Sequence, residues 1–107
     1  MSAVFSPCRR WRYSLTRSAA PHGESTVVFV GLNPSTADEA RDDPTTRRCV
    51  RFARDWGFAR LELVNLFAYA ATDPTDLRAA PDPVGPENLV AVRTALGRAA
   101  VVICAWG

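Results

Sequence analysis

The chain has 107 residues, of which 48% are hydrophobic and 22% charged, and its formal net charge is +2. These values are typical of one globular domain and exclude a strongly acidic or basic chain whose partners follow from charge alone. No apolar run approaches the roughly 20 residues that cross a bilayer, and the N-terminus lacks the basic start and long apolar middle of a signal peptide. We therefore expect a cytoplasmic protein without a membrane partner.

Arginine supplies all thirteen basic residues, and ten of them lie in residues 1–60. Guanidinium groups suit phosphates and base edges, but an Arg-only chain rich in alanine also fits the codon bias of a GC-rich genome, which we favour. Cys8, Cys49 and Cys104 are odd in number and widely spaced. They predict buried or idle thiols rather than a disulfide framework or a zinc site.

The first regular element is predicted from alternation after position 10. The apolar side of this segment is formed by Trp11, Tyr13 and Leu15, and the polar side by Arg12, Ser14 and Thr16. A period of two predicts a half-buried strand. Residues 18–25 contain Pro21 and Gly23 and are expected to form a loop that leaves His22, the only histidine, in solvent.

The central feature of the sequence is the segment Thr26–Thr36, an apolar run that breaks abruptly into a turn. The run has no alternation, which is typical of a strand buried on both faces. Turn-forming residues follow, namely Gly31, Asn33, Pro34 and Ser35. In an open α/β sheet, ligands bind beyond the carboxyl ends of the strands. The loop Gly31–Ser35, with Leu32, is therefore the best candidate site, and an ordinary surface turn is the alternative.

Acidic residues are concentrated just before the first predicted helix, at Asp38, Glu39, Asp42 and Asp43. Such a cluster can hold a hard cation, but it lacks the Asp-x-Asp-x-Asp-Gly spacing of a calcium loop. Carboxylates are also stabilised at a helix N-terminus by the macrodipole. We therefore expect helix capping and solvation rather than a metal ion, and we expect no cofactor.

A helix is predicted from Pro44 to Trp56, because Asp43 is a strong N-cap followed by proline and Gly57 ends the pattern. The apolar stripe expected to face the sheet consists of Cys49, Phe52, Ala53 and Trp56. The remaining surface carries Arg47, Arg48, Arg51 and Arg54. We favour a solvated face here, and a face toward phosphate is the alternative.

A second core strand is predicted over Leu61–Phe67, with Asn65 near its end. Asn is depleted in strands, and at a ligand crevice its amide can donate to and accept from a base edge. A turn-forming Asn at a strand end is the alternative. Ala68–Pro86 is then a long connection of a kind that is often functional, with one helical turn at Pro74–Ala79.

The C-terminal part is predicted to contain a helix over Pro86–Arg98 and a third buried strand over Ala99–Ala105. The helix is expected to place Leu89, Val92 and Leu96 on one face. The strand is expected to pair with Val27–Val30 and to leave its other edge open, where self-association is possible.

The order strand, helix, strand, helix, strand predicts one α/β domain over residues 1–107, with three α/β/α layers and a small, mostly parallel sheet. A buried parallel strand needs neighbours on both of its edges. We therefore expect the domain to be incomplete at its C-terminus.

The sequence resembles the DUF1643 family, an uncharacterised family of bacterial and archaeal proteins. The resemblance is carried by Gly31-Leu32-Asn33-Pro34-Ser35-Thr36-Ala37-Asp38, followed by Asp42-Asp43-Pro44-Thr45 and Arg47-Arg48. It extends from Arg12-Tyr13 to Ala105-Trp106-Gly107 and implies no activity. Members of the family continue past the Trp-Gly pair, which agrees with a truncated chain.

A more distant similarity, to uracil-DNA glycosylases, implies a fold and a chemistry. It is carried by Gly31-Leu32-Asn33-Pro34-Ser35, Val64-Asn65-Leu66 and Val101-Val102-Ile103-Cys104-Ala105-Trp106-Gly107, in the same order as in that superfamily. The resemblance implies that Asn33 positions the attacking water at the sugar carbon and that Asn65 hydrogen-bonds a flipped base. Phe67 and Tyr69 are the nearby candidates for the aromatic residue that stacks on the base.

The chain departs from the glycosylase pattern at two points. Ser35 replaces the final glycine of the first motif, and the His-Pro-Ser loop, whose histidine stabilises the leaving base anion, has no counterpart before residue 107. A glycosylase without that donor loses a major part of its electrostatic stabilisation. We therefore expect this chain to be inactive as it stands.

Three functions remain open. The first is an N-glycosylase-like hydrolase that acts on DNA or a free nucleotide, with Arg47 and Arg51 at the phosphate. The second is a non-catalytic module that binds a nucleotide or nucleic acid in the same crevice, and the third is a structural domain without a ligand there. We rank binding or hydrolysis of a nucleobase compound first.

Overall fold

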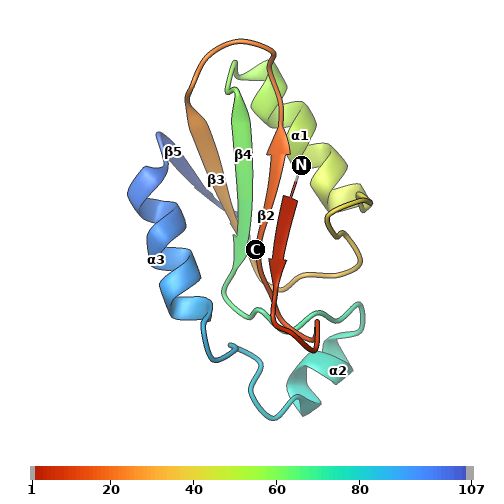
Figure 1. Cartoon of the computed structure of the whole chain (residues 1–107). Helices are drawn as coiled ribbons and strands as arrows, with labels where there is room; N and C mark the ends of the chain where they lie inside the picture. Colours follow the sequence, from red (N-terminus) through yellow and green to blue (C-terminus); the bar gives the residue numbers. More distant parts are fainter. Residues whose placement is uncertain (1, 106–107) are drawn as a thin grey trace.

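Figure 1 shows the computed structural model of the chain, which describes residues 2–105. Within these residues the strands are β1 (Ser2–Phe5), β2 (Arg12–Ser18), β3 (Thr26–Gly31), β4 (Arg60–Asn65) and β5 (Val101–Cys104). The helices in the same range are α1 (Pro44–Asp55), α2 (Pro74–Ala79) and α3 (Asn88–Arg98). Each predicted element is present, and β1 is an additional strand. Trp106 and Gly107, which end the third motif of the resemblance to uracil-DNA glycosylases, lie outside the described residues.

The strands form one mixed sheet in the order β1-β2-β4-β3-β5. β2 is antiparallel to both β1 and β4, whereas β3 is parallel to β4 and to β5. The prediction of a mostly parallel sheet is therefore wrong for its N-terminal half. The reason is the short connection over residues 19–25, which turns the chain back, because a parallel return needs a crossover of about a dozen residues or more.

One helix packs on each face of the central strands (Figure 1). The α1 side is a core cluster made of Leu15, Val27, Phe29, Ala37, Cys49, Ala53, Leu61 and Leu63. The α3 side consists of Val28, Val30, Val64 and Ala95. Successive residues of β3 thus face opposite helices, which explains why this strand is apolar without alternation. β4 is also buried on both faces but carries Glu62, which pairs with Arg98 of α3.

Only part of each predicted apolar helix stripe is buried. At the end of α1, Phe52 and the C-cap residue Trp56 are 41% and 51% exposed and stack on each other with ring centroids 5.4 Å apart. In α3, Leu89 and Leu96 are 66% and 41% exposed. α3 packs on the sheet through Ala95, with Val92 partly buried beside it, and these leucines remain outside that contact. α3 also begins at Asn88 and not at Pro86, as predicted.

A β-bulge in β2 reverses the side on which its residues lie. Val4 pairs with Ser14 whereas Phe5 pairs with Arg12, so Tyr13 is an extra residue in β2. Beyond the bulge Leu15 faces the α1 core, and before it Arg12 does so too, with only 1% of its surface exposed. The prediction that Arg12 and Leu15 lie on opposite sides of the strand is therefore wrong.

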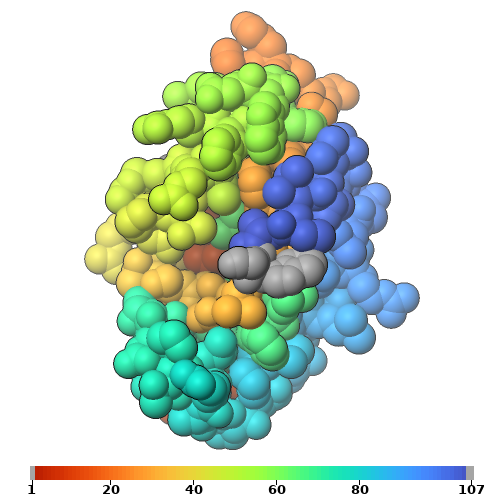
Figure 2. Space-filling model, turned by 180° about the vertical axis from the view of Figure 1, so that it is seen from behind, coloured from red at the N-terminus to blue at the C-terminus, as the bar shows by residue number. Residues whose placement is uncertain are grey.

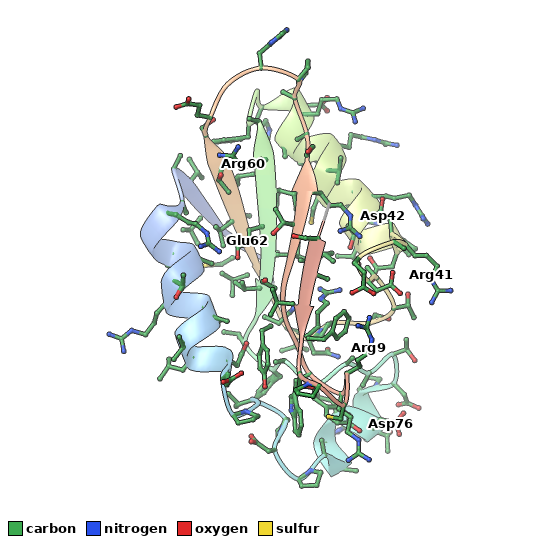
Figure 3. All side chains as sticks on the ribbon, viewed as in Figure 1. Arg9, Arg41, Asp42, Arg60, Glu62 and Asp76 are labelled. Carbon is green, nitrogen blue, oxygen red and sulfur yellow. The ribbon has the colours of Figure 1, made fainter. Side chains whose placement is uncertain are left out.

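The acidic run before α1 is held by ion pairs and backbone hydrogen bonds. Arg17 donates from Nε to Asp42 at 2.7 Å and from Nη2 to the carbonyl of Asp38, and Glu39 pairs with Arg9 at 2.7 Å. Figure 3 shows Arg9, Arg41 and Asp42 gathered beside the start of α1. Capping and ion pairing thus explain these carboxylates. Within residues 2–105, no group of three or more His, Cys, Asp or Glu side chains is arranged to hold a metal ion.

The pairing of β5 with β3 confirms the predicted partner strand, with Val27 opposite Val101. In the described part of the chain, the other edge of β5 has no strand beside it. The prediction that this strand is buried is wrong, because Val101 and Val102 are each 41% exposed at the edge of the sheet. None of the helices within residues 2–105 is long and apolar enough to span a membrane.

Candidate functional site

A cavity of about 190 Å³ lies at the carboxyl ends of β3 and β4, beside the N-terminus of α1. The Gly31–Ser35 loop and Asn65 form part of its wall, and the rest consists of Arg12, Phe29, Asp43, Thr45, Cys49, Leu63 and Ala105. Figure 2 shows a hollow on this side of the molecule, between the gold-to-yellow segment that leads into α1 and the blue β5. Since liquid water takes up about 30 Å³ per molecule, the cavity admits one small ring or charged group.

Asn33 and Asn65 line this cavity together. The Asn33 Nδ2 donates to the carbonyl of Ala71 at 2.8 Å and to that of Pro34 at 3.1 Å. This leaves the side-chain oxygen of Asn33 as an acceptor. Asn65 is 2% exposed, and its buried Nδ2 has no hydrogen-bond partner. A buried donor without a partner is uncommon in a folded protein and points to a ligand or a bound water.

Gly31 allows the approach of Asn65. A Cβ atom at position 31 would lie 2.8 Å from the Asn65 Oδ1, which is closer than real side chains come. The backbone of Gly31 is not in the left-handed region, so close approach and not conformation requires glycine here. The two strand ends therefore hold the Asn65 amide directly against the loop.

Arg12 supplies a buried positive charge in the cavity wall. Its Nη1 donates to the carbonyl of Ala37 at 3.0 Å, and its Nε is buried without a partner. Burial, partly opposed by the charge of Asp43 and reinforced by that of Arg17, lowers the pKa of Arg12 to about 10. The guanidinium therefore remains charged at neutral pH.

Asp43 combines a capping role with a place in the cavity. Its Oδ1 accepts the N–H of Thr46 at 2.8 Å and its Oδ2 that of Ala37 at 3.3 Å. Burial acts to raise the pKa of this carboxyl, but the hydrogen bonds from Thr46 and Ala37 and the charge of Arg12 outweigh it, so the pKa is lowered. The predicted N-cap is confirmed, and both of its oxygens are engaged by backbone N–H groups.

The other side chains predicted for the site lie elsewhere. Arg47 and Arg51 line a groove on the outer side of α1, with Asp42. Tyr69 packs edge-on against Trp11 with ring centroids 6.2 Å apart and lines a different hollow. Phe67 follows the end of β4 and is absent from the cavity wall. The aromatic ring in the wall is that of Phe29, which sequence reasoning assigned only to the core.

The cysteines differ from one another in exposure. Cys49 is buried in the cavity wall, where burial and the nearby Asp43 raise its pKa to about 11, so that it is an unreactive thiol. Cys8 and Cys104 are exposed, so of the thiols predicted as buried or idle only Cys49 is buried. Hydrogen bonds from Ser6 and from the backbone of Arg10 lower the pKa of Cys8.

Residues 12–107 match the family described as "Protein of unknown function (DUF1643)". The chain belongs to the DUF1643 family. No curated protein and no solved structure matches it.

In this DUF1643 chain, sequence reasoning located the loop and Asn65 but missed Arg12, Asp43 as a wall residue and Thr45. The place of Arg12 in the cavity wall could not be predicted, because regular alternation assigns this residue to the polar side of its strand. Only the bulge at Tyr13 turns it toward the core.

Proposed function

We propose that this DUF1643 protein binds a nucleobase compound, either DNA or a free nucleotide, in the cavity and recognises or hydrolyses its N-glycosidic bond. The observation that carries the proposal is the presence of two amide side chains, Asn33 and Asn65, in one small cavity, with the Asn65 Nδ2 buried and unpartnered. An amide both donates and accepts hydrogen bonds, as base edges do. The cavity is also of a size that suits one planar ring.

In this proposal Asn65 reads the base, and the free oxygen of Asn33 accepts a hydrogen bond from the water that attacks the sugar carbon. A base in duplex DNA would have to be flipped out to enter such a cavity. The likeness to uracil-DNA glycosylases, including their three-layer architecture, belongs to the same proposal. It is supported by the order of the motifs and by one helix on each face of the sheet.

A non-catalytic binding module is the second candidate. One observation favours it: the Asn33 Nδ2 already fastens the loop to the carbonyl of Ala71. An Asn fixed in this way can shape a binding loop without taking part in chemistry. In a module, the cavity would hold the base and release nothing.

The test uses a longer DUF1643 relative that keeps Gly31-Leu32-Asn33-Pro34-Ser35, because this chain has no counterpart of the His-Pro-Ser loop before residue 107. It compares the changes equivalent to Asn33→Ala and Asn65→Ala with the unmodified relative on uracil-containing single-stranded DNA, mismatched DNA and free nucleotides. If Asn33 positions water, its replacement abolishes base release and leaves binding largely intact, because the contact matters mostly in the transition state. If Asn65 reads the base, its replacement weakens binding and discrimination together, by about 1–3 kcal/mol. Released base is measured by chromatography and binding by calorimetry.

Arg47→Gln serves as a control, because Arg47 lies on the outer side of α1 and not in the cavity wall. It is expected to leave base recognition unchanged. Tight, salt-sensitive binding without base release would favour the module. If both Asn variants change only the melting temperature, the site has no ligand of this class.

A further inference from the structure

Two arginines of β2 are almost fully buried, but they differ in how their guanidinium groups are used. Arg12 and Arg17 are 1% and 2% exposed. Arg17 donates from all three nitrogens, to Asp42 and to backbone carbonyls. Arg12 donates only from Nη1 among the contacts within residues 2–105, and its Nε has no partner. Only Arg12 therefore retains donors for a ligand.

The free side of Arg12 is the edge formed by its Nε and Nη2 atoms. In Arg98 the same edge is occupied, because Nε and Nη2 donate to the two carboxylate oxygens of Glu62 at 2.9 and 2.8 Å. Figure 3 shows Glu62 on the α3 side of the sheet. A guanidinium edge of this kind engages two coplanar acceptors at once. The ligand that fits Arg12 is thus a group with two adjacent acceptor atoms.

Arg12 has a negatively charged neighbour, Asp43, but no hydrogen-bonded anionic partner among residues 2–105. A buried cation is costly to leave without one. The charge of Asp43 acts on Arg12 across the cavity wall, but the two oxygens of this carboxylate accept the backbone N–H groups of Thr46 and Ala37 and not the guanidinium. A ligand whose negative charge lies on hydrogen-bond acceptors can therefore be stabilised by the free donors of Arg12, against the repulsion of Asp43.

We propose that Arg12 binds the departing nucleobase anion through its Nε–Nη2 edge. This rests on the proposed function. Water attacks the sugar carbon, the carbon–nitrogen bond breaks, and the bonding electron pair stays on the base nitrogen; the attacking water loses a proton to solvent, and the released base later takes one up. The departing nitrogen of either base type has an acceptor beside it, the 2-oxygen of a pyrimidine or the 3-nitrogen of a purine. The anion therefore presents two adjacent acceptors to Arg12.

The test measures binding of free xanthine to the full chain by calorimetry, below and above the pH at which xanthine loses a proton near neutrality. The anion is expected to bind about tenfold more tightly than the neutral base, because hydrogen bonds to a charged group are the stronger ones. Arg12→Gln is expected to abolish this preference. Arg12→Lys keeps the charge but not the two-donor edge and should retain part of it, and the control Arg47→Gln should retain all of it.

Equal affinity for the two forms of xanthine, or an unchanged preference in Arg12→Gln, overturns the inference. In a longer relative that releases base, an unchanged rate of release after the change equivalent to Arg12→Gln does so as well and leaves the proposed function standing. Binding of inorganic phosphate that depends on Arg12, with no binding of any base, overturns both.

If Arg12→Gln does not fold, the side-chain ¹⁵Nε resonance of Arg12 in the unmodified chain decides the question. Addition of anionic xanthine is expected to shift this resonance, whereas those of Arg17 and Arg98 stay in place because their Nε atoms already have partners. Failure of the Arg12 resonance to move overturns the inference.

Discussion

At the scale of single residues, the contact between Gly31 and Asn65 sets the shape of the cavity. The two residues are register partners in the parallel pair β3–β4, so their positions follow from the sheet itself. The Cα of residue 31 has room only for a hydrogen atom on the side of the Asn65 amide, because a Cβ atom there would lie 2.8 Å from the Asn65 Oδ1. A substitution there tests the packing of the site without removing any polar group.

Gly31→Ala is expected to displace the Asn65 side chain, to reduce ligand binding and to lower the free energy of unfolding by about 1–3 kcal/mol, the cost of overpacking. Gly97→Ala in α3 is the matched control, because a Cβ atom there meets nothing within 4 Å. It should stabilise the chain by up to about 1 kcal/mol through helix propensity. Urea unfolding of both variants checks this, and equal effects would contradict the tight contact.

At the scale of elements, the start of α1 joins the loop that precedes it to the cavity. Asp43 caps the helix through the N–H of Thr46 and also accepts the N–H of Ala37. Arg17 holds the intervening residues through Asp42 and the carbonyls of Asp38 and Arg41. The loop that carries the acidic run is therefore fixed at both ends by buried polar groups.

Asp43→Ala is expected to lower the free energy of unfolding at neutral pH by about 0.5–2 kcal/mol, the usual cost of a lost N-cap. Asp73→Ala, which removes a similar cap from α2, should cost less because α2 buries none of its residues. Urea unfolding at neutral pH measures both differences.

Acid should reduce the contribution of Asp43. Its pKa is lowered from the ordinary value of 3.8 in the folded chain, so its stabilisation is fully present above 3.8 and is lost as the pH falls through the folded-state pKa. The stability difference between the unmodified chain and Asp43→Ala is therefore expected to shrink in this acidic range. A difference that stays constant as the pH falls would contradict the role of the charged carboxylate.

At the scale of the whole molecule, apolar side chains remain exposed on α3 and β5. The exposed residues on these two elements are Leu89, Val90, Leu96, Val101 and Val102. β5 also ends the sheet in the described part of the chain. An apolar edge strand offers unpaired backbone groups to another chain, and we propose that copies of this chain associate through β5.

Val102→Lys is expected to reduce this association, because a lysine on an edge strand opposes pairing with a second strand. Val90→Lys is the control, since Val90 is 68% exposed on α3 and not on a strand. Sedimentation velocity at several concentrations measures the result. A loss of association in Val90→Lys alone would place the contact on the helix, and monomers at every concentration would remove the proposal.

The sequence alone was sufficient for the features that depend on local patterns. The apolar run of β3 and the Asp43-Pro44 start of α1 locate these elements within a residue or two. Burial on both faces and helix capping each produce a pattern among residues that are adjacent in the sequence. Asn33 and Asn65 were expected in one crevice because the carboxyl ends of parallel strands meet at one edge of a sheet. Both side chains line the cavity at the carboxyl ends of β3 and β4.

Only the tertiary structure decided which charges and edges face that cavity. Arg12 is turned inward by the extra residue Tyr13, and the pairing with β1 that defines this bulge joins segments that no periodicity relates. Arg47 and Arg51 point away from the cavity because the side of α1 that faces the sheet is set by Cys49 and Ala53. β5 is exposed because it has one neighbour strand in the described chain, and an apolar sequence does not reveal how many neighbours its strand has.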